Sequence, residues 1–227
     1  MKALLSALIL VFVHLFCFVN SGGTHQTIIW KLNDTLDVGG RKPVVLGAPL
    51  SVKGDSINGL FFDGTKDGLI VPVNPLRELK NFTIEILFKP MESTSTAPRM
   101  MHIQDEKGNR CTIELRLTSK GSWYLDTFLK NGNTNKGLSL IDSSKQHPCN
   151  DWYWVALIYD GTKMTSYVNS QKEGEGMVSL DAMTSGETSL GVRLNKINWF
   201  RGQISEIRFH SAPLDNKMLQ RLEPGIN

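Results

Sequence analysis

Residues 82–88 read Phe-Thr-Ile-Glu-Ile-Leu-Phe, and this stretch decides the fold class. Its bulkiest apolar side chains recur at every second position, so an extended chain brings them to one face. That period of two is typical of a β-strand with one buried face. Pro90 ends the strand because proline has no N–H to donate within a sheet. A single strand buries nothing by itself, so partner strands must lie elsewhere in the chain.

Similar runs follow at regular spacing. We expect further strands at 111–117, 123–129, 152–159, 164–169, 191–194 and 204–210, with Gly, Asn and Asp clusters between them. The run 152–159 is apolar on both faces, which is typical of a strand inside a sheet. Only residues 215–222 favour a helix, with Asp215 as its N-cap. Many short strands joined by such turns indicate a sandwich or a barrel in one domain.

The composition agrees with a folded domain and excludes several classes of protein. Of the 227 residues, 41% are hydrophobic and 21% are charged, which rules out a disordered or fibrous protein. The 25 Lys and Arg against 22 Asp and Glu leave a net charge of +3. So small an excess gives no general attraction to nucleic acid, and we expect no nucleic-acid partner.

Residues 1–21 have the features of a secretory signal peptide. Lys2 precedes an apolar run from 3 to 19, which is shorter than the roughly 20 residues that cross a bilayer. We therefore expect a secreted protein, periplasmic or extracellular, with one domain over 22–227 and no membrane span. Lipid anchoring through Cys17 is the less favoured alternative, because bulky residues precede that cysteine.

Two cysteines remain once the signal is removed, namely Cys111 and Cys149. An oxidising compartment would let them pair, and such a disulfide would stabilise the fold by about 3–4 kcal/mol. The alternative is two separate buried thiols. Neither CxxC nor HExxH spacing is present, so the sequence shows no zinc motif.

Three groups of residues, taken in order, resemble a known family. They are Leu-Phe-Phe-Asp-Gly at 60–64 with 68–72 and 81–90, Trp-Tyr-Trp-Val-Ala-Leu-Ile-Tyr-Asp-Gly at 152–161 with Tyr-Val-Asn at 167–169, and 200–209 with Pro-Leu-Asp at 213–215. Together they resemble the laminin G-like branch of the concanavalin A-like lectin/glucanase superfamily, over roughly residues 27–222.

The resemblance implies an all-β fold, a jelly-roll β-sandwich of two antiparallel sheets with one concave face, to which we add the short C-terminal helix. Members of the family are secreted or surface modules that bind glycans or proteins, and some relatives are glycosidases. Calcium is common in the superfamily, and the resemblance points to Asp63 and Glu206 as candidate Ca²⁺ ligands. Against this, Ser205 stands where the family often has Asp, and an Asp-Gly pair is more often a turn former.

Catalysis is not expected from these residues. The glucanases that resemble this chain carry Glu-x-Asp-x-x-Glu on one strand, and no such run is present. Glu85 and Glu114 both point away from the core face of their strands, so they could form the pair of carboxyl groups that a glycosidase needs. The favoured interpretation is that both are solvated carboxylates on an outer face, with no catalytic role.

Sugar binding requires aromatic faces with polar groups beside them, and the chain has candidates. Trp154 faces outward if Val155 and Leu157 face the core. For Trp123 the alternative is that it caps the core, since large aromatic side chains are mostly buried. The candidate ligand-binding residues are Trp154, Trp199, Trp123, Asp126, Glu114 and Arg116.

We therefore expect a secreted, non-catalytic module that recognises carbohydrate on the concave face. The alternatives are a structural or adhesion domain that binds a cell-surface protein and, less favoured, a glycoside hydrolase of the same fold.

Overall fold

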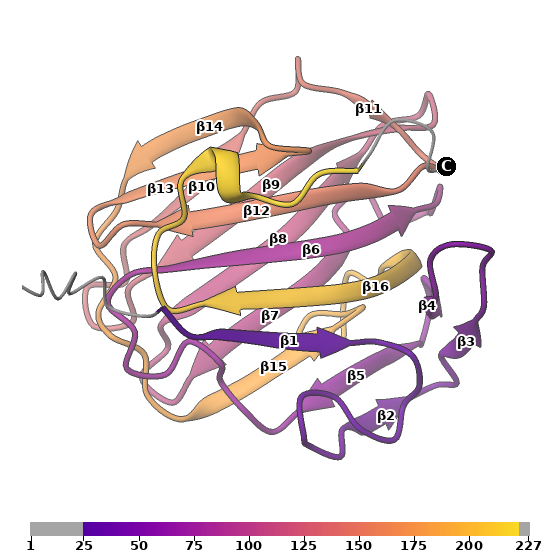
Figure 1. Cartoon of the computed structure of the whole chain (residues 1–227), viewed down its shortest axis with the longest axis horizontal. Helices are drawn as coiled ribbons and strands as arrows, with labels where there is room; N and C mark the ends of the chain where they lie inside the picture. The colour runs from indigo at the N-terminus through magenta and orange to yellow at the C-terminus, as the bar shows by residue number, and fades with distance from the viewer. Residues whose placement is uncertain (1–24, 223–227) are drawn as a thin grey trace, which may run out of the picture.

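A computed structural model describes residues 25–222, and the expected signal peptide and Cys17 lie outside these residues. The described chain folds into two antiparallel sheets of eight strands each, packed face to face (Figure 1). This is the jelly-roll β-sandwich expected from the sequence. Within residues 25–222 the structure has no helix long and apolar enough to cross a membrane.

The two sheets are named after a central strand of each. The β6 sheet contains, in spatial order, β14 (Gln171–Met177), β13 (Lys163–Val168), β12 (Tyr153–Tyr159), β6 (Phe82–Pro90), β16 (Arg201–His210), β4 (Gly59–Asp63) and β3 (Leu50–Val52), and β1 (Thr27–Lys31) also pairs with β16. The β8 sheet contains β10 (Gly137–Ile141), β9 (Ser122–Lys130), β8 (Arg110–Leu117), β7 (Arg99–Asp105), β15 (Gly186–Leu190), β5 (Gly68–Val71) and β2 (Val44–Leu46), and β11 (His147–Pro148) also pairs with β9.

The core lies between the sheets and is built by the alternation seen in the sequence. Ile84 and Phe88 of β6 point inward to meet Ile113 of β8, and all three are fully buried. Phe88 packs edge-on against Trp123 of β9, with ring centroids 5.2 Å apart. Such aromatic pairs contribute about 0.5–1.5 kcal/mol beyond the burial of their area. The inward set leaves every second side chain of each strand on an outer face.

Most of the expected strands are confirmed within a few residues, and 152–159 does lie inside its sheet, as β12 between β6 and β13. The expected strand at 191–194 is wrong, because the strand here is β15 and it ends at Leu190. Gly191 has a φ of +75°, and a Cβ at this position would lie 2.4 Å from the Phe62 ring. The chain therefore turns away from the sheet at this glycine and enters a loop over 191–200.

The expected C-terminal helix is present but shorter than the expected 215–222. Asn216–Met218 form a single 3₁₀ turn, with Asp215 as its N-cap accepting a hydrogen bond from the Lys217 amide at 2.9 Å. So short a segment cannot sustain a helix alone, because nucleation is unfavourable. Beyond Leu219 the chain bonds to the sheet beneath it, since the Gln220 amide donates to Glu85 at 2.6 Å.

Candidate functional site

Most of the candidate residues fall on two opposite outer faces, whereas Trp123 lies in the core and Trp199 in a loop. Trp154 and Glu85 point outward from the β6 sheet, whereas Glu114, Arg116 and Asp126 point outward from the β8 sheet. Glu85 and Glu114 are thus separated by the full thickness of the sandwich. The two stacked sheets alone lie about 10 Å apart, so these carboxyl groups cannot flank one glycosidic bond. The alternative in which Glu85 and Glu114 form a catalytic pair is therefore wrong. The favoured expectation of two solvated carboxylates is wrong as well, because Glu85 is 1% and Glu114 3% exposed.

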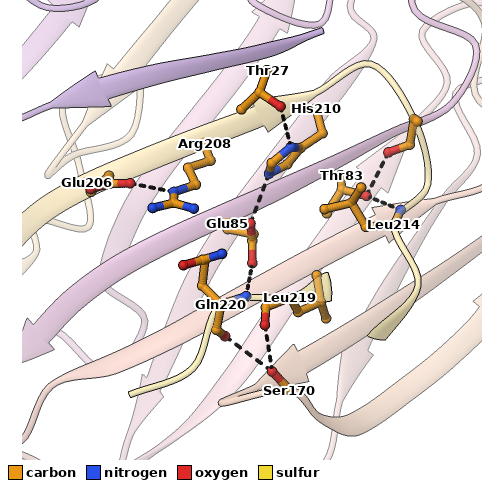
Figure 2. A network of polar contacts seen from close by, with 11 residues as sticks. Thr27, Thr83, Glu85, Ser170, Glu206, Arg208, His210, Leu214, Leu219 and Gln220 are labelled. Carbon is orange, nitrogen blue, oxygen red and sulfur yellow. Dashed lines mark hydrogen bonds and ion pairs between the residues drawn. The ribbon is translucent and has the colours of Figure 1, made fainter. Parts of the chain in front are cut away.

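The C-terminal segment 211–222 covers the outer face of the β6 sheet (Figure 2). The Thr83 hydroxyl donates to the Ala212 carbonyl and accepts from the Leu214 amide, both at 2.9 Å. The Ser170 hydroxyl contacts the Leu219 and Gln220 carbonyls at 3.3 Å. These contacts hold the segment flat against β6, β12 and β13.

A buried polar chain lies under this cover. One Glu85 oxygen accepts from the Gln220 amide, and the other lies 2.9 Å from Nε2 of His210 (Figure 2). The other ring nitrogen of His210 lies 2.9 Å from the Thr27 hydroxyl. Each of these groups has a hydrogen-bond partner within the protein. The series from Thr27 to Gln220 therefore has a structural role and presents nothing to a ligand.

Val155 and Leu157 face the core, so Trp154 faces outward, but the expectation of an exposed platform is wrong. Only 7% of the residue is exposed, because it packs with Leu87, Trp152 and Leu222 under the C-terminal segment. The Arg208 guanidinium lies 5.1 Å from its ring centroid, within the range of a cation–π contact. The Trp154 ring therefore packs within the protein and is not accessible to a ligand.

Trp123 is a core residue, so the alternative interpretation of this residue is the right one. It is fully buried, packs against Tyr153 with centroids 5.0 Å apart, and its indole N–H donates to the Pro148 carbonyl at 3.2 Å.

Trp199 is only half-buried and lies in the loop 191–200. Its neighbour Asn198 accepts a hydrogen bond from the backbone of β7. Of the three tryptophans, Trp199 alone remains partly exposed.

Asp63 is a turn former. Its Oδ1 accepts from the amides of Thr65 at 2.8 Å, Lys66 at 2.9 Å and Asp67 at 3.1 Å. Burial by itself would raise the pKa of Asp63, but the hydrogen bonds from Lys66 and Thr65 outweigh it and lower the pKa to about 2. These hydrogen bonds of the Asp63 carboxylate stabilise the loop between β4 and β5.

Glu206 lies on β16, on the outer face of the β6 sheet, in ion pairs with Lys31 and Arg208. Two cations beside one carboxylate disfavour a third, so Asp63 and Glu206 do not fit a Ca²⁺ ion. Among residues 25–222, no group of three His, Cys, Asp or Glu side chains is arranged to hold a metal. The predicted calcium ligands are therefore not supported.

Cys111 and Cys149 are both free and buried, so the predicted disulfide is wrong and the alternative of two separate thiols is right. Cys111 lies opposite Leu129 on β9, whereas the Cys149 amide bonds to the Gly121 carbonyl just before β9 begins. Eight residues of β9 correspond to roughly 26 Å, far beyond the reach of a disulfide.

The outer face of the β8 sheet brings together polar side chains from three adjacent strands. The backbone register sets Arg99, Glu114 and Asp126 side by side, and His102 beside Thr112 in the next row. This polar face comprises Arg99, His102 and Gln104 of β7, Arg110, Thr112, Glu114 and Arg116 of β8, and Tyr124, Asp126 and Phe128 of β9.

Two ion pairs cross this polar face, Arg99 with Glu114 and Arg116 with Asp126, the second at 2.6 Å. Burial lowers the pKa of Arg99 to about 10, with a further contribution from the nearby charge of Arg193. Burial also raises the pKa of Asp126, although Arg116 opposes the shift. Charges are thus held in a dry layer, where their interactions are stronger than in water.

Several buried polar atoms of this face have no hydrogen-bond partner among residues 25–222. They are Nε of Arg99, Nε2 of His102, Oγ1 of Thr112 and Oδ1 of Asp126. Leaving such a group unpaired costs about 1–3 kcal/mol, so a polar ligand that pairs with them would bind favourably. The four atoms offer both donors and an acceptor.

His102 is a hydrogen-bond donor toward this face. Burial, followed by the charges of Arg110 and Arg99, lowers its pKa to about 3, so the ring is neutral at physiological pH. Its Nδ1 accepts from the Leu194 amide at 3.4 Å, which assigns the single ring proton to Nε2. The unpaired Nε2–H therefore calls for an acceptor.

Two adjoining pockets border the polar face. The first, of about 330 Å³, is lined by His102, Gln104, Arg110, Arg193, Leu194 and Asn195. The second, of about 540 Å³, shares Gln104 and Leu194 with the first and adds Asp105, Glu106 and Glu187. Both volumes lie within the range of about 300–1,000 Å³ that ligand pockets span.

Of the six candidate ligand-binding residues, the structure brings together only Glu114, Arg116 and Asp126. Trp154 lies on the opposite sheet, Trp123 in the core and Trp199 in a loop. The sequence did not single out Glu114, Arg116 and Asp126. It missed Arg99, His102 and Arg193. Residues 99–105 show no clean alternation because a bulge shifts the register of β7 at Arg99. The sequence predicts a strand at 191–194, whereas Arg193 lies in the loop 191–200.

Comparison with known proteins agrees with this architecture. The family model described as the concanavalin A-like lectin/glucanases superfamily, a laminin G type, matches residues 63–219. No curated protein sequence matches the chain.

Solved structures share the fold at low sequence identity. Domain 4 of AbnA, a GH43 extracellular arabinanase from Geobacillus stearothermophilus solved with arabinotriose, has a TM-score of 0.64 and 16% identity over 85% of this chain and 96% of that one. The binding domain of Paraclostridial Mosquitocidal Protein 1 has a TM-score of 0.64 and 14% identity over 84% of this chain. The binding domain of Botulinum Neurotoxin DC, in complex with SialylT, has 0.58 and 15% over 84%. This chain spans 50% and 49% of those two toxin fragments.

The matched model covers well over half of the chain, and the two-sheet topology is independent support for the match. The chain therefore belongs to the concanavalin A-like lectin/glucanase superfamily.

Proposed function

We propose that this protein is a secreted, non-catalytic binding module that recognises carbohydrate on the polar face of the β8 sheet. The observation that carries the proposal is the set of buried, unpaired polar atoms on Arg99, His102, Thr112 and Asp126. A sugar presents closely spaced hydroxyls, each of which is both donor and acceptor. These atoms have almost no accessible surface, so a sugar would pair with them once neighbouring side chains move aside. The backbone of three strands fixes the positions that the sugar would then meet.

Aromatic side chains flank the polar atoms. Tyr124 and Phe128 point outward from β9 on either side of Asp126, and both are half-buried, so part of each ring remains accessible. An aromatic ring beside hydrogen-bonding groups suits the apolar side of a pyranose. Tyr124 and Phe128 replace Trp154 as the aromatic candidates.

Two of the solved relatives support carbohydrate as the ligand class, since one was solved with arabinotriose and the other with SialylT. Secretion is proposed on the sequence of residues 1–21 alone. N-terminal sequencing of the protein exported from its own host would test it, and a mature chain that still begins at Met1 would contradict it.

A glycan array tests the function, with wild type beside Thr112→Val. The Thr112 hydroxyl is unpaired, so its removal should leave stability unchanged or slightly raised while glycan affinity falls about 2- to 10-fold. Thr165→Val, the same change on the outer face of the β6 sheet, is the matched control and should leave affinity unchanged. No glycan bound by folded wild type would refute the proposal, as would equal affinity in wild type and Thr112→Val.

A protein partner is the alternative, and one observation favours it. Ile29 of β1, Val44 of β2 and Leu50 of β3 are 47%, 61% and 59% exposed, and these strands lie on the same side of the sandwich (Figure 1). Exposed apolar side chains on edge strands are typical of interfaces. A silent array would favour this second function.

A further inference from the structure

The polar face has more positive charge than its carboxylates neutralise. Glu114 pairs with Arg99, and Asp126 pairs with Arg116. Within residues 25–222, neither Arg110 nor Arg193 has a carboxylate partner. The Arg110 Nε contacts only the neutral Gln104 side chain, at 3.3 Å.

The unneutralised arginines meet at one place. Arg110 and Arg193 both line the pocket of about 330 Å³, which contains no acidic side chain. Lys130 lies directly opposite Arg110 on β9 and adds a third cation at the margin. The pocket also contains the unpaired Nε2–H of His102, which donates and cannot accept. Every charged or unpaired group here calls for an acceptor or an anion.

The adjoining pocket of about 540 Å³ has the opposite character. It is lined by three acidic residues, Asp105, Glu106 and Glu187. An anionic group would be repelled there and attracted to the arginines beside it. The boundary between the pockets therefore fixes where along a bound chain the charge must lie.

Resting on the carbohydrate-binding function proposed above, we propose that the ligand is an acidic glycan whose carboxylate or sulfate group lies between Arg110 and Arg193. Guanidinium groups bind both anions in bidentate geometry, with charge-assisted hydrogen bonds. The neighbouring sugar unit, which occupies the acidic pocket, is neutral. A pocket of about 330 Å³ is small for a ligand site and takes a single charged unit.

The test begins with the glycans bound on the array, which should carry a carboxylate or a sulfate. Isothermal titration then compares matched probes: trigalacturonate against its methyl ester, 3′-sialyllactose against lactose, and a sulfated chondroitin disaccharide against its unsulfated form. The charged member of the pair that binds should bind at least 10-fold tighter. Which pair responds distinguishes a carboxylate from a sulfate.

Two variants locate the anion. Arg193→Ala should reduce affinity for the charged probe roughly 10- to 100-fold, the loss expected for a charged hydrogen bond, with little effect on the neutral probe. Arg110→Gln should act in the same direction, and Arg193→Lys should retain part of the affinity. Arg41→Ala, at an exposed arginine between β1 and β2, is the matched control and should bind as wild type does.

The outcomes separate this inference from the function on which it rests. Array ligands that are all neutral, or a charged ligand whose affinity survives Arg193→Ala and Arg110→Gln unchanged, would overturn the inference while carbohydrate binding stands. No glycan bound by wild type, shown to be folded by thermal unfolding, would overturn both.

Discussion

The ion pair of Arg99 with Glu114 gives the sharpest test of the polar face. The two residues are 9% and 3% exposed, so neither charge can return to water when its partner is removed. Removing one partner of a buried pair costs about 3–5 kcal/mol. Glu114→Gln should cost about 3 kcal/mol, the lower end, because the amide retains one hydrogen bond to the guanidinium.

The assay is a double-mutant cycle of Glu114→Gln, Arg99→Met and the combined variant, followed by urea and thermal unfolding. For a domain of this size, about 3 kcal/mol corresponds to a fall in Tm of roughly 6–12 °C. The combined variant leaves neither charge of the pair buried alone, so it should be no less stable than either single variant. Glu175→Gln, in the exposed pair with Lys163, is the control and should unfold close to wild type.

Two results would refute this reasoning. One is a loss below about 1 kcal/mol for Glu114→Gln, which would mean that the pair is effectively solvated. The other is additivity, in which the combined variant loses the sum of the two single losses. The same variant also frees Arg99, so it should tighten the binding of an acidic glycan even as it destabilises the fold.

Three further predictions concern the core, one turn and the thiols. Trp123→Ala should lower the free energy of unfolding by about 3–5 kcal/mol, whereas Trp199→Ala should lower it by less than about 1 kcal/mol; equal losses in urea titrations would contradict the burial of these residues. Hydrogen bonds lower the pKa of Asp63 from 3.8 to about 2 on folding, so its carboxylate stabilises the fold above about pH 4 and this contribution is lost as the pH falls through about 2. The difference in unfolding free energy between wild type and Asp63→Asn should therefore shrink over that range, and a difference independent of pH would argue against it. Burial raises the pKa of the Cys111 and Cys149 thiols, the latter to about 11, so a thiol reagent should label both only after denaturation; a peptide map that shows them linked would disprove the free state.

Local patterns predicted most of the strands, because alternation is a property of neighbouring residues. The inward set of β6 was correct from the sequence. The sequence left the facing of β12 open, and the structure turns Trp154 outward. The failures share a cause that is not local. The strand expected at 191–194 is absent because Gly191, at a φ of +75°, turns the chain where the Phe62 ring leaves no room for a Cβ. The helix expected at 215–222 is shortened to Asn216–Met218, and the Gln220 amide then donates to Glu85.

The sequence by itself determined an all-β fold and the inward face of strands that alternate cleanly, such as β6, since a period of two needs no knowledge of distant residues. It could not determine which outer face is open. Glu85 and Glu114 occupy equivalent outward positions on their strands, yet Glu85 is buried beneath the C-terminal segment and Glu114 is buried in an ion pair with Arg99. That difference depends on where residues 211–222 pack and on the order of the strands within each sheet. Only the tertiary structure brings such distant segments together and so decides where a ligand can bind.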